Sequence, residues 1–129
     1  MAYKALDVAR YIINYSYKIN KKVTNFKLQK LLYYVQARFL VEKGEKCFKD
    51  ELISWDYGPV VQEVYDEFKY SGRSELNFQE TYKTIEFNKT VQNIQIYDKK
   101  FDESILKLED KEMIKLVIDS YKIVMDFIW

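Results

Sequence analysis

The sequence predicts a mainly α-helical fold of the α+β class, with about four amphipathic helices, a short strand and a small β-hairpin. Apolar residues recur at spacings of three and four in four stretches, which is the period of an amphipathic helix. The 129 residues include 3 glycines and 1 proline, too few for the many turns of a β-sandwich. Hydrophobic residues make up 48% of the chain, enough for one core, so we expect a single domain over residues 1–129.

The first two helices are expected at about residues 5–18 and 25–43. Thr24 is a suitable N-cap because its hydroxyl can accept a backbone N–H, and Gly44 can take the left-handed conformation that ends a helix. One face of the second helix carries a basic-aromatic set at helical spacing, namely Lys27, Lys30, Tyr34 and Arg38. Its core stripe is expected to consist of Leu28, Leu31, Leu32, Val35 and Phe39.

A brief strand is expected at residues 51–57, ended by Gly58 and Pro59. Pro59 suits the first position of a third helix, where its missing N–H costs nothing. That helix, at about residues 60–70, would turn valines and aromatic residues inward. Its outer face would present Glu63, Asp66 and Glu67.

Two later segments, 84–87 and 94–97, alternate apolar and polar residues, which predicts a small hairpin around Asn88 and Lys89. The last helix is expected at about residues 110–127. Its apolar stripe is continuous and comprises Met113, Ile114, Val117, Ile118, Tyr121, Val124, Met125 and Ile128.

The residue inventory argues against an enzyme. The chain contains no histidine, which removes the commonest general base and metal ligand and any Ser–His or Cys–His pair. Its glycines are too scattered for a phosphate-binding loop. Lys46 and Lys49 could lower the pKa of Cys47 a little, but no base or second thiol can be matched to it. We therefore expect Cys47 to be non-functional, and we expect no catalytic residue, no metal and no cofactor.

The same inventory suits a cytoplasmic protein. A lone cysteine excludes an internal disulfide, as expected in a reducing compartment. The first residues lack the charged-then-apolar order of a signal peptide, and no apolar run approaches the ~20 residues that span a bilayer. We expect no membrane association.

Charge is divided unevenly along the chain. Residues 1–49 hold 11 Lys and Arg against 3 acids, a net charge of +8, and the other 80 residues hold 10 against 17, a net charge of −7. Such a division indicates either an anionic partner for the first part or a basic helix that lies beside an acidic one. The sequence favours the second interpretation slightly.

Two groups of residues are candidates for binding a partner. One is the basic-aromatic face of Lys27, Lys30, Tyr34 and Arg38, because Arg and Tyr are enriched at interface hot spots. Taken alone, this face is explained better by a solvated helix surface covered by long side chains. The other is the run from Trp55 to Pro59. Trp55 is expected to pack in the core, and contact with a partner is an open alternative for Tyr57.

The segments 25–37 (NFKLQKLLYYVQA), 55–61 (WDYGPVV) and Val64-Tyr65 follow one another at a spacing that resembles the SocA-like phage-associated proteins, the Panacea antitoxin domain family. Residues 5–13 resemble the first helix of that family as well. The resemblance makes Leu28, Leu31, Leu32, Trp55, Gly58 and Pro59 its structural motif. It implies an antitoxin that is encoded beside a toxin and neutralises the toxin by direct binding. One family member acts as an adaptor that delivers its toxin to a cytosolic protease, so a protease is a further expected partner. A second copy of this chain, in a homo-oligomer, is another.

The end of the chain departs from the family pattern. Family members usually continue past the last helix into a segment resembling Thr-His-x-x-x-Pro-Trp, whereas this sequence has no histidine and stops at Trp129. We therefore expect an atypical or shortened end after about Tyr121.

A DNA-binding regulator of the winged-helix type is the alternative function, because the order helix, helix, strand, helix, hairpin fits such a unit. The third helix would then read DNA, but its acids Glu63, Asp66 and Glu67 would be repelled by phosphates. Nucleic acid is thus a less favoured partner than a toxin.

Overall fold

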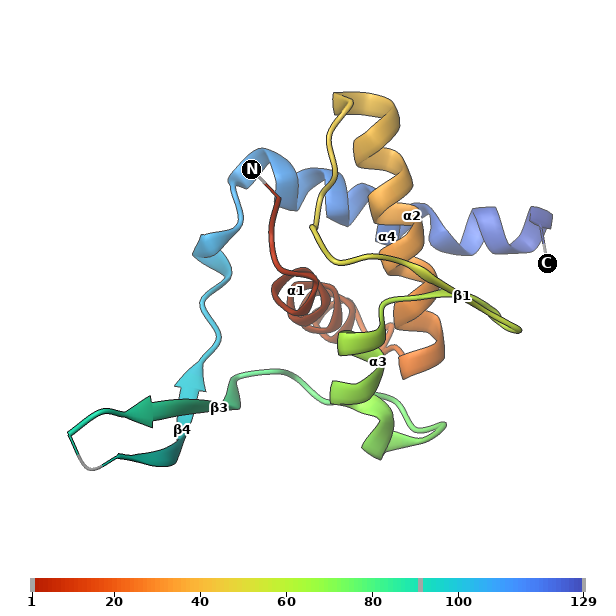
Figure 1. Cartoon of the computed structure of the whole chain (residues 1–129). Coiled ribbons are helices and arrows are strands. Elements are labelled where there is room, and N and C mark those ends of the chain that lie inside the picture. The colour runs from red at the N-terminus through yellow and green to blue at the C-terminus, as the bar shows by residue number, and fades with distance from the viewer. Residues whose placement is uncertain (1, 91, 129) are drawn as a thin grey trace.

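The computed structural model describes the backbone of residues 2–90 and 92–128, and side chains as far as Tyr121. Helix α2 lies in the middle of the molecule and contacts α1, α3, α4 and strand β2 (Figure 1). The α+β class is confirmed, with four α-helices and two separate two-stranded antiparallel sheets in the described part of the chain. The elements are α1 (Ala5–Lys18), α2 (Asn25–Lys43), β1 (Ile53–Trp55), β2 (Gly58–Val60), α3 (Gln62–Phe68), β3 (Thr81–Asn88), β4 (Asn93–Lys100) and α4 (Leu108–Ile128), with short 3₁₀ turns at Lys69–Ser71 and Glu103–Ile105.

The ends of α2 follow its capping residues. The Thr24 hydroxyl accepts a hydrogen bond of 3.1 Å from the backbone N–H of Lys27, as expected for an N-cap. Gly44 adopts a left-handed φ of 67° and donates its N–H to the carbonyl of Leu40, which ends the helix. The predicted bounds of α1 and α2 are confirmed.

The core lies where α1, α2, α3 and α4 meet. The expected stripe of α2 is buried there, with Leu28 and Leu32 fully inaccessible to solvent. Residues from the loops complete it, such as Phe48 between α2 and β1 and Leu106 before α4. The predicted inner face of α4 is buried from Ile114 to Tyr121, while Val124, Met125, Ile128 and the chain end that was expected to be atypical lie outside the described side chains.

The segment around Pro59 differs from the prediction. The chain turns back over Asp56 and Tyr57, so that Trp55 pairs with Gly58 and Pro59 lies in strand β2 opposite Ser54. The placement of Pro59 at the start of the third helix was wrong, since α3 begins at Gln62. Gly58 has a φ of 114°, which favours glycine and allows the tight turn, and a strand in a two-stranded sheet has one edge without ladder bonds where proline is tolerated.

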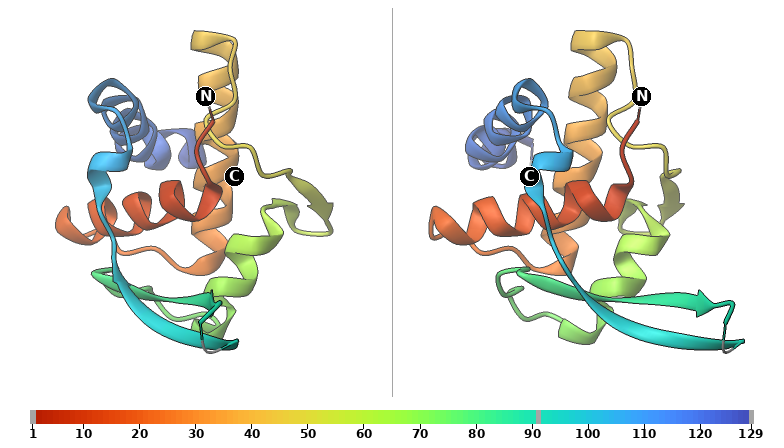
Figure 2. Two further views of the ribbon diagram at one scale, coloured as in Figure 1. Left: turned by 60° about the vertical axis from the view of Figure 1, so that its left-hand side comes forward. Right: turned by 90° about the vertical axis from the view of Figure 1, so that its left-hand side faces the viewer.

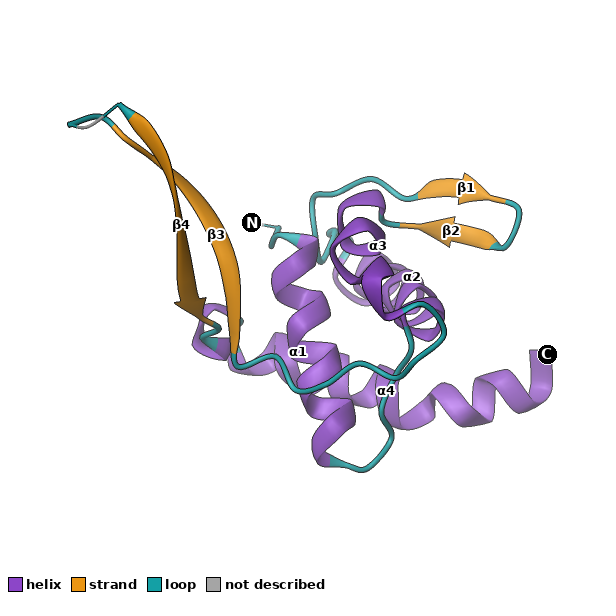
Figure 3. Cartoon of the chain, turned by 90° about the horizontal axis from the view of Figure 1, so that it is seen from below, coloured by secondary structure: helices purple, strands orange, loops and turns teal. Residues whose placement is uncertain are grey.

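The hairpin of β3 and β4 confirms the second β element. Ile85 pairs with Ile96, and the turn follows the Asn88–Asn93 pair, slightly later than predicted. The two hairpins project from opposite sides of the helical body (Figures 1 and 3), and β3–β4 passes below α1 (Figure 2).

The base of the β3–β4 hairpin is fastened to α1. The Arg10 guanidinium stacks over the Tyr82 ring at 4.0 Å and pairs with Glu67 of α3. The Asn14 side chain accepts the N–H of Gln79 at 2.6 Å and donates to its carbonyl at 3.0 Å. These contacts fix the direction in which the hairpin leaves the body.

Candidate partner-binding groove

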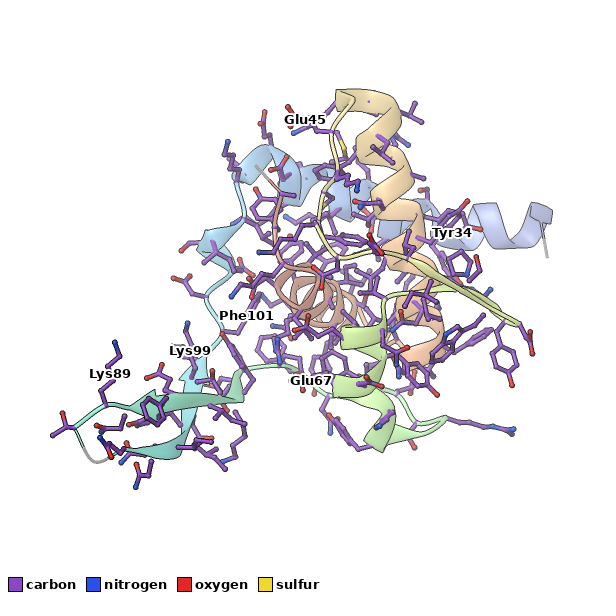
Figure 4. The ribbon with its side chains drawn as sticks, viewed as in Figure 1. Tyr34, Glu45, Glu67, Lys89, Lys99 and Phe101 are labelled. Atoms are coloured by element: carbon purple, nitrogen blue, oxygen red, sulfur yellow. The ribbon has the colours of Figure 1, made fainter. Side chains whose placement is uncertain are left out.

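A groove of about 670 Å³ lies between α2, the β1–β2 hairpin and α3. It brings together the two segments that the sequence singled out, although they are far apart along the chain. Its walls include Lys30 and Tyr34 of α2 and the run of Trp55, Tyr57, Gly58 and Pro59. Tyr34 lies on the side of α2 remote from the β3–β4 hairpin, where Lys89 and Lys99 are found (Figure 4).

Two buried amides hold the walls of the groove together. The side-chain oxygen of Gln29 accepts the backbone N–H of Val61 at 2.9 Å, and its Nε2 donates to Asn25 at 3.1 Å. Asn25 in turn donates to the carbonyl of Tyr65 at 3.1 Å. Helix α2 is thereby bonded to both ends of the segment that runs from β2 into α3. A buried, satisfied polar network of this kind fixes one arrangement of the elements.

Gln29 and Gln36 of α2 are both buried. Gln36 accepts the backbone N–H groups of Cys47 and Phe48 and donates to the Phe48 carbonyl at 2.8 Å. It therefore holds the loop after α2, as Gln29 holds β2. The signal in the sequence is that these amides interrupt the apolar side of α2, where a polar residue requires a partner.

Aromatic rings dominate the groove, and several contact one another edge to face. Trp55 lies 4.8 Å from Tyr65 with an interplanar angle of 73°, and Tyr33 lies 5.5 Å from Tyr34 with an angle of 61°. Trp55 is half-buried, whereas Tyr57 at the hairpin tip is 72% exposed. Among the residues that the structure describes, the aromatic side chains that line the groove are Phe26, Tyr33, Tyr34, Trp55, Tyr57 and Tyr65.

The basic-aromatic face of α2 is divided by the structure. Lys30 and Tyr34 line the groove, but Lys27 lies with its ammonium 5.2 Å from the centre of the Tyr121 ring of α4. Arg38 forms an exposed ion pair of 3.2 Å with Glu42, one turn further along α2. Lys27 and Arg38 therefore flank the groove without lining it. Sequence reasoning missed four lining residues: Phe26 at the start of α2, and Tyr65, Lys69 and Arg73, which are brought in by α3 and the turn after it.

The uneven charge of the chain is partly matched inside the molecule. Arg10 pairs with Glu67, and Lys43 pairs with Asp110 and Glu109, so bases of the first part meet acids of the second. Glu63, Asp66 and Glu67 of α3 do not line the groove, although Asp66 forms an exposed pair of 3.9 Å with the lining residue Lys69. The pKa of Glu63 is raised by burial and by a hydrogen bond with Asp50.

Cys47 is buried in the loop that follows α2. Burial and the nearby charge of Asp110 raise the pKa of its thiol to about 12. The expectation that Lys46 and Lys49 would lower this pKa was wrong, because loss of hydration outweighs any effect of exposed lysines. In the described part of the chain, no group of three or more His, Cys, Asp or Glu side chains is arranged to hold a metal ion.

Residues 28–126 match the model of the family described as antitoxin SocA-like, Panacea domain. The chain belongs to the SocA-like Panacea antitoxin family. The match includes most of α2, the β1–β2 hairpin, α3 and the β3–β4 hairpin.

Among curated proteins, this Panacea domain is similar to antitoxin SocA of Caulobacter vibrioides (strain NA1000 / CB15N). The two are 35% identical over 68 residues, which cover 53% of this chain and 36% of that protein. The match thus spans about a third of the relative's length. No solved structure matches the chain. None of the described helices is long and apolar enough to cross a membrane.

Proposed function

We propose that this protein is an antitoxin that acts in the cytoplasm and neutralises a cognate toxin by direct binding. The observation that carries the proposal is the groove in which the two family motifs meet. It offers exposed Tyr57 beside half-buried Trp55 and Tyr34, and such aromatic anchors in a partly buried pocket are typical of binding hot spots. Lys30 belongs to the same contact, and Lys27 and Arg38 extend it at its rim.

The experiment pairs this chain with the protein encoded by the adjacent reading frame, expressed alone and together with the antitoxin. We expect the neighbour to stop growth and co-expression to restore it. Tyr57→Ala should weaken toxin binding by ~1–3 kcal/mol, as expected of a hot-spot residue. Tyr70→Ala is the matched control, because Tyr70 is 75% exposed and lies outside the groove. Equal toxin binding by both variants would exclude the groove as the contact.

Neutralisation follows by one of two routes, masking of the toxin or its delivery to a cytosolic protease. Masking leaves the toxin at constant abundance in cells that carry the antitoxin, whereas delivery shortens its lifetime. A pulse-chase of the toxin with and without this protein separates them. A homo-oligomer is a further proposal, and sedimentation of the purified chain tests it.

A DNA-binding regulator is the second candidate function. It would require α3 to approach phosphates, yet the exposed side of α3 carries Glu63, Asp66 and Glu67. These charges favour the protein-binding function. A salt-dependent gel shift on the DNA upstream of the gene is the direct test, and specific retention there would support the regulator.

A further inference from the structure

The charges that line the groove have one sign. Lys30 of α2, Lys69 at the end of α3 and Arg73 in the following turn line it. Among the lining residues that the structure describes, none is an aspartate or a glutamate. This contrasts with the chain as a whole, in which 21 basic and 20 acidic residues nearly cancel. The local excess of positive charge is therefore a property of the groove and does not follow from composition.

The ammonium group of Lys30 lies in the groove at a position where it is only partly hydrated. This group lies 4.8 Å from the centre of the Phe26 ring, and burial lowers the pKa of Lys30 below its ordinary value. A cation that has lost part of its water shell interacts more strongly with an incoming anion than an exposed one does. Lys69 and Arg73 are exposed, so they contribute attraction over a longer range that salt screens. The contribution of Lys69 is reduced by its exposed pair of 3.9 Å with Asp66.

The aromatic rings supply the second half of the recognition. Tyr57 stands at the hairpin tip, mostly exposed, and faces the groove that also contains Trp55 and Tyr65. Because the rings of Trp55 and Tyr65 meet edge to face, they form the floor of a pocket and not a row of parallel faces. A single apolar or aromatic side chain fits such a floor better than successive stacked bases do. A volume of about 670 Å³ has room for a few residues of peptide.

We propose that the groove binds a segment of the toxin in which carboxylate side chains stand next to an aromatic or large apolar side chain. The carboxylates would lie against Lys30, Lys69 and Arg73, and the apolar side chain would lie against Trp55 and Tyr57. This inference rests on the proposed function, since it names the chemistry of the segment that the antitoxin holds.

The probe is a random copolymer of glutamate and tyrosine, and Trp55 is the reporter. Trp129→Phe leaves Trp55 as the one tryptophan of the chain, since the sequence contains 2. We expect the copolymer to change Trp55 emission, with an apparent affinity at least about tenfold above that of polyglutamate or of a lysine–tyrosine copolymer. High salt should weaken binding without abolishing it, because the apolar contact remains.

Charge reversal in the groove gives the decisive comparison. Lys30→Glu with Lys69→Glu and Arg73→Glu should lower the affinity for the copolymer by at least about tenfold. The matched control reverses the same number of exposed lysines outside the groove, at Lys46, Lys49 and Lys89, and should retain affinity within about threefold. Should the triple variant unfold, Arg73→Glu against Lys89→Glu makes the same comparison with exposed positions. Equal losses in both sets, no binding of the copolymer, or equally tight binding of single-stranded poly(U) would each overturn the proposal.

The same variants separate this inference from the proposed function. If Tyr57→Ala loses toxin binding but the triple charge reversal in the groove keeps it, the antitoxin function stands. The proposal that the groove binds an acidic segment is then refuted. If toxin binding survives both changes, the groove is not the site that binds the toxin. Loss in both, with Tyr70→Ala and the control reversal unaffected, supports the two proposals together.

Discussion

The side-chain oxygen of Gln29 in α2 accepts the backbone N–H of Val61, which lies between β2 and α3, at 2.9 Å. Both residues are buried, with Gln29 3% and Val61 1% exposed. The bond joins the helix that carries Lys30 and Tyr34 to the hairpin that carries Trp55 and Tyr57. The Gln29 amide therefore helps to hold two walls of the candidate groove together.

Gln29→Leu removes the acceptor and leaves the buried N–H of Val61 without its partner. We expect the free energy of unfolding to fall by ~1–3 kcal/mol, the cost of an unsatisfied buried donor. Because β2 is released from α2, the emission of Trp55 should also shift to the red in the Trp129→Phe background. Gln62→Leu is the control, since Gln62 bonds to Asp66 on the surface and should change stability by less than about 0.5 kcal/mol. Urea denaturation measures both, and equal effects would contradict the role given to Gln29.

Arg10 is 2% exposed and has Glu67 as its charge partner. Glu67→Gln should cost about 1–3 kcal/mol, less than the 3–5 kcal/mol typical of a fully buried pair, because Glu67 is 39% exposed and partly screened. Asp66→Asn, which removes an exposed pair with Lys69, should cost at most about 0.5 kcal/mol. Thermal unfolding of the two variants tests the difference. A loss as small in Glu67→Gln as in Asp66→Asn would show that the buried guanidinium does not depend on this carboxylate.

Cys47 should make stability depend on pH in the alkaline range. Its folded-state pKa of about 12 lies above the ordinary value of 9.0, so the unfolded chain releases the proton first as pH rises. The stabilising contribution is complete below pH 9 and is lost between pH 9 and about 12. Relative to Cys47→Ala, the native chain should lose about 1 kcal/mol of stability between pH 8 and pH 10. Urea midpoints at the two pH values measure this, and parallel shifts in both proteins would contradict it.

The buried position also changes what substitution of Cys47 is expected to do. A serine hydroxyl there needs a hydrogen-bond partner, so Cys47→Ser should destabilise the fold by ~1–3 kcal/mol. We still expect toxin affinity to remain unchanged, because Cys47 lies outside the groove. A loss of affinity beyond about tenfold, or ~1.4 kcal/mol, with the fold intact would show that Cys47 has a role in binding.

One face of the β3–β4 hairpin is apolar and open to solvent. Ile85 opposes Ile96 and Phe87 opposes Ile94, and all four side chains are 60–67% exposed. Phe87→Thr with Ile94→Thr should change the free energy of unfolding by less than about 0.5 kcal/mol. A greater loss would mean that this face packs against the body, and thermal unfolding at several protein concentrations distinguishes that from an effect on self-association.

Residues of α2 that lie outside the groove should contribute less to toxin binding than residues that line it. Arg38 lies outside the groove in an exposed pair with Glu42, so Arg38→Ala should weaken toxin binding by about 0.5 kcal/mol, against ~1–3 kcal/mol for Tyr57→Ala. Isothermal titration with the toxin gives both values. If Arg38→Ala weakens toxin binding more than Tyr57→Ala does, the toxin contacts α2 near Glu42 and not near the β1–β2 hairpin.

Local signals in the sequence were sufficient to define α1, α2 and α4, but not the start of α3. Thr24 and Gly44 mark the two ends of α2, because capping depends on residues within one turn of the helix end. The leucines of α2 and the inner face of α4 follow from helical period alone. The alternation of residues around Ile85 and Ile96 likewise predicts the second hairpin, since pairing across a short turn is local.

The groove was decided by contacts between segments far apart in the chain. Pro59 alone fits a helix start or an edge strand equally well, and the tertiary structure places it in the strand that leads to the bond between Val61 and Gln29. The division of the α2 face, with Lys30 inside the groove and Arg38 outside it, depends on where β1–β2 and α3 pack. Periodicity specifies which face of a helix a residue occupies, whereas the element that covers this face is set by the whole fold.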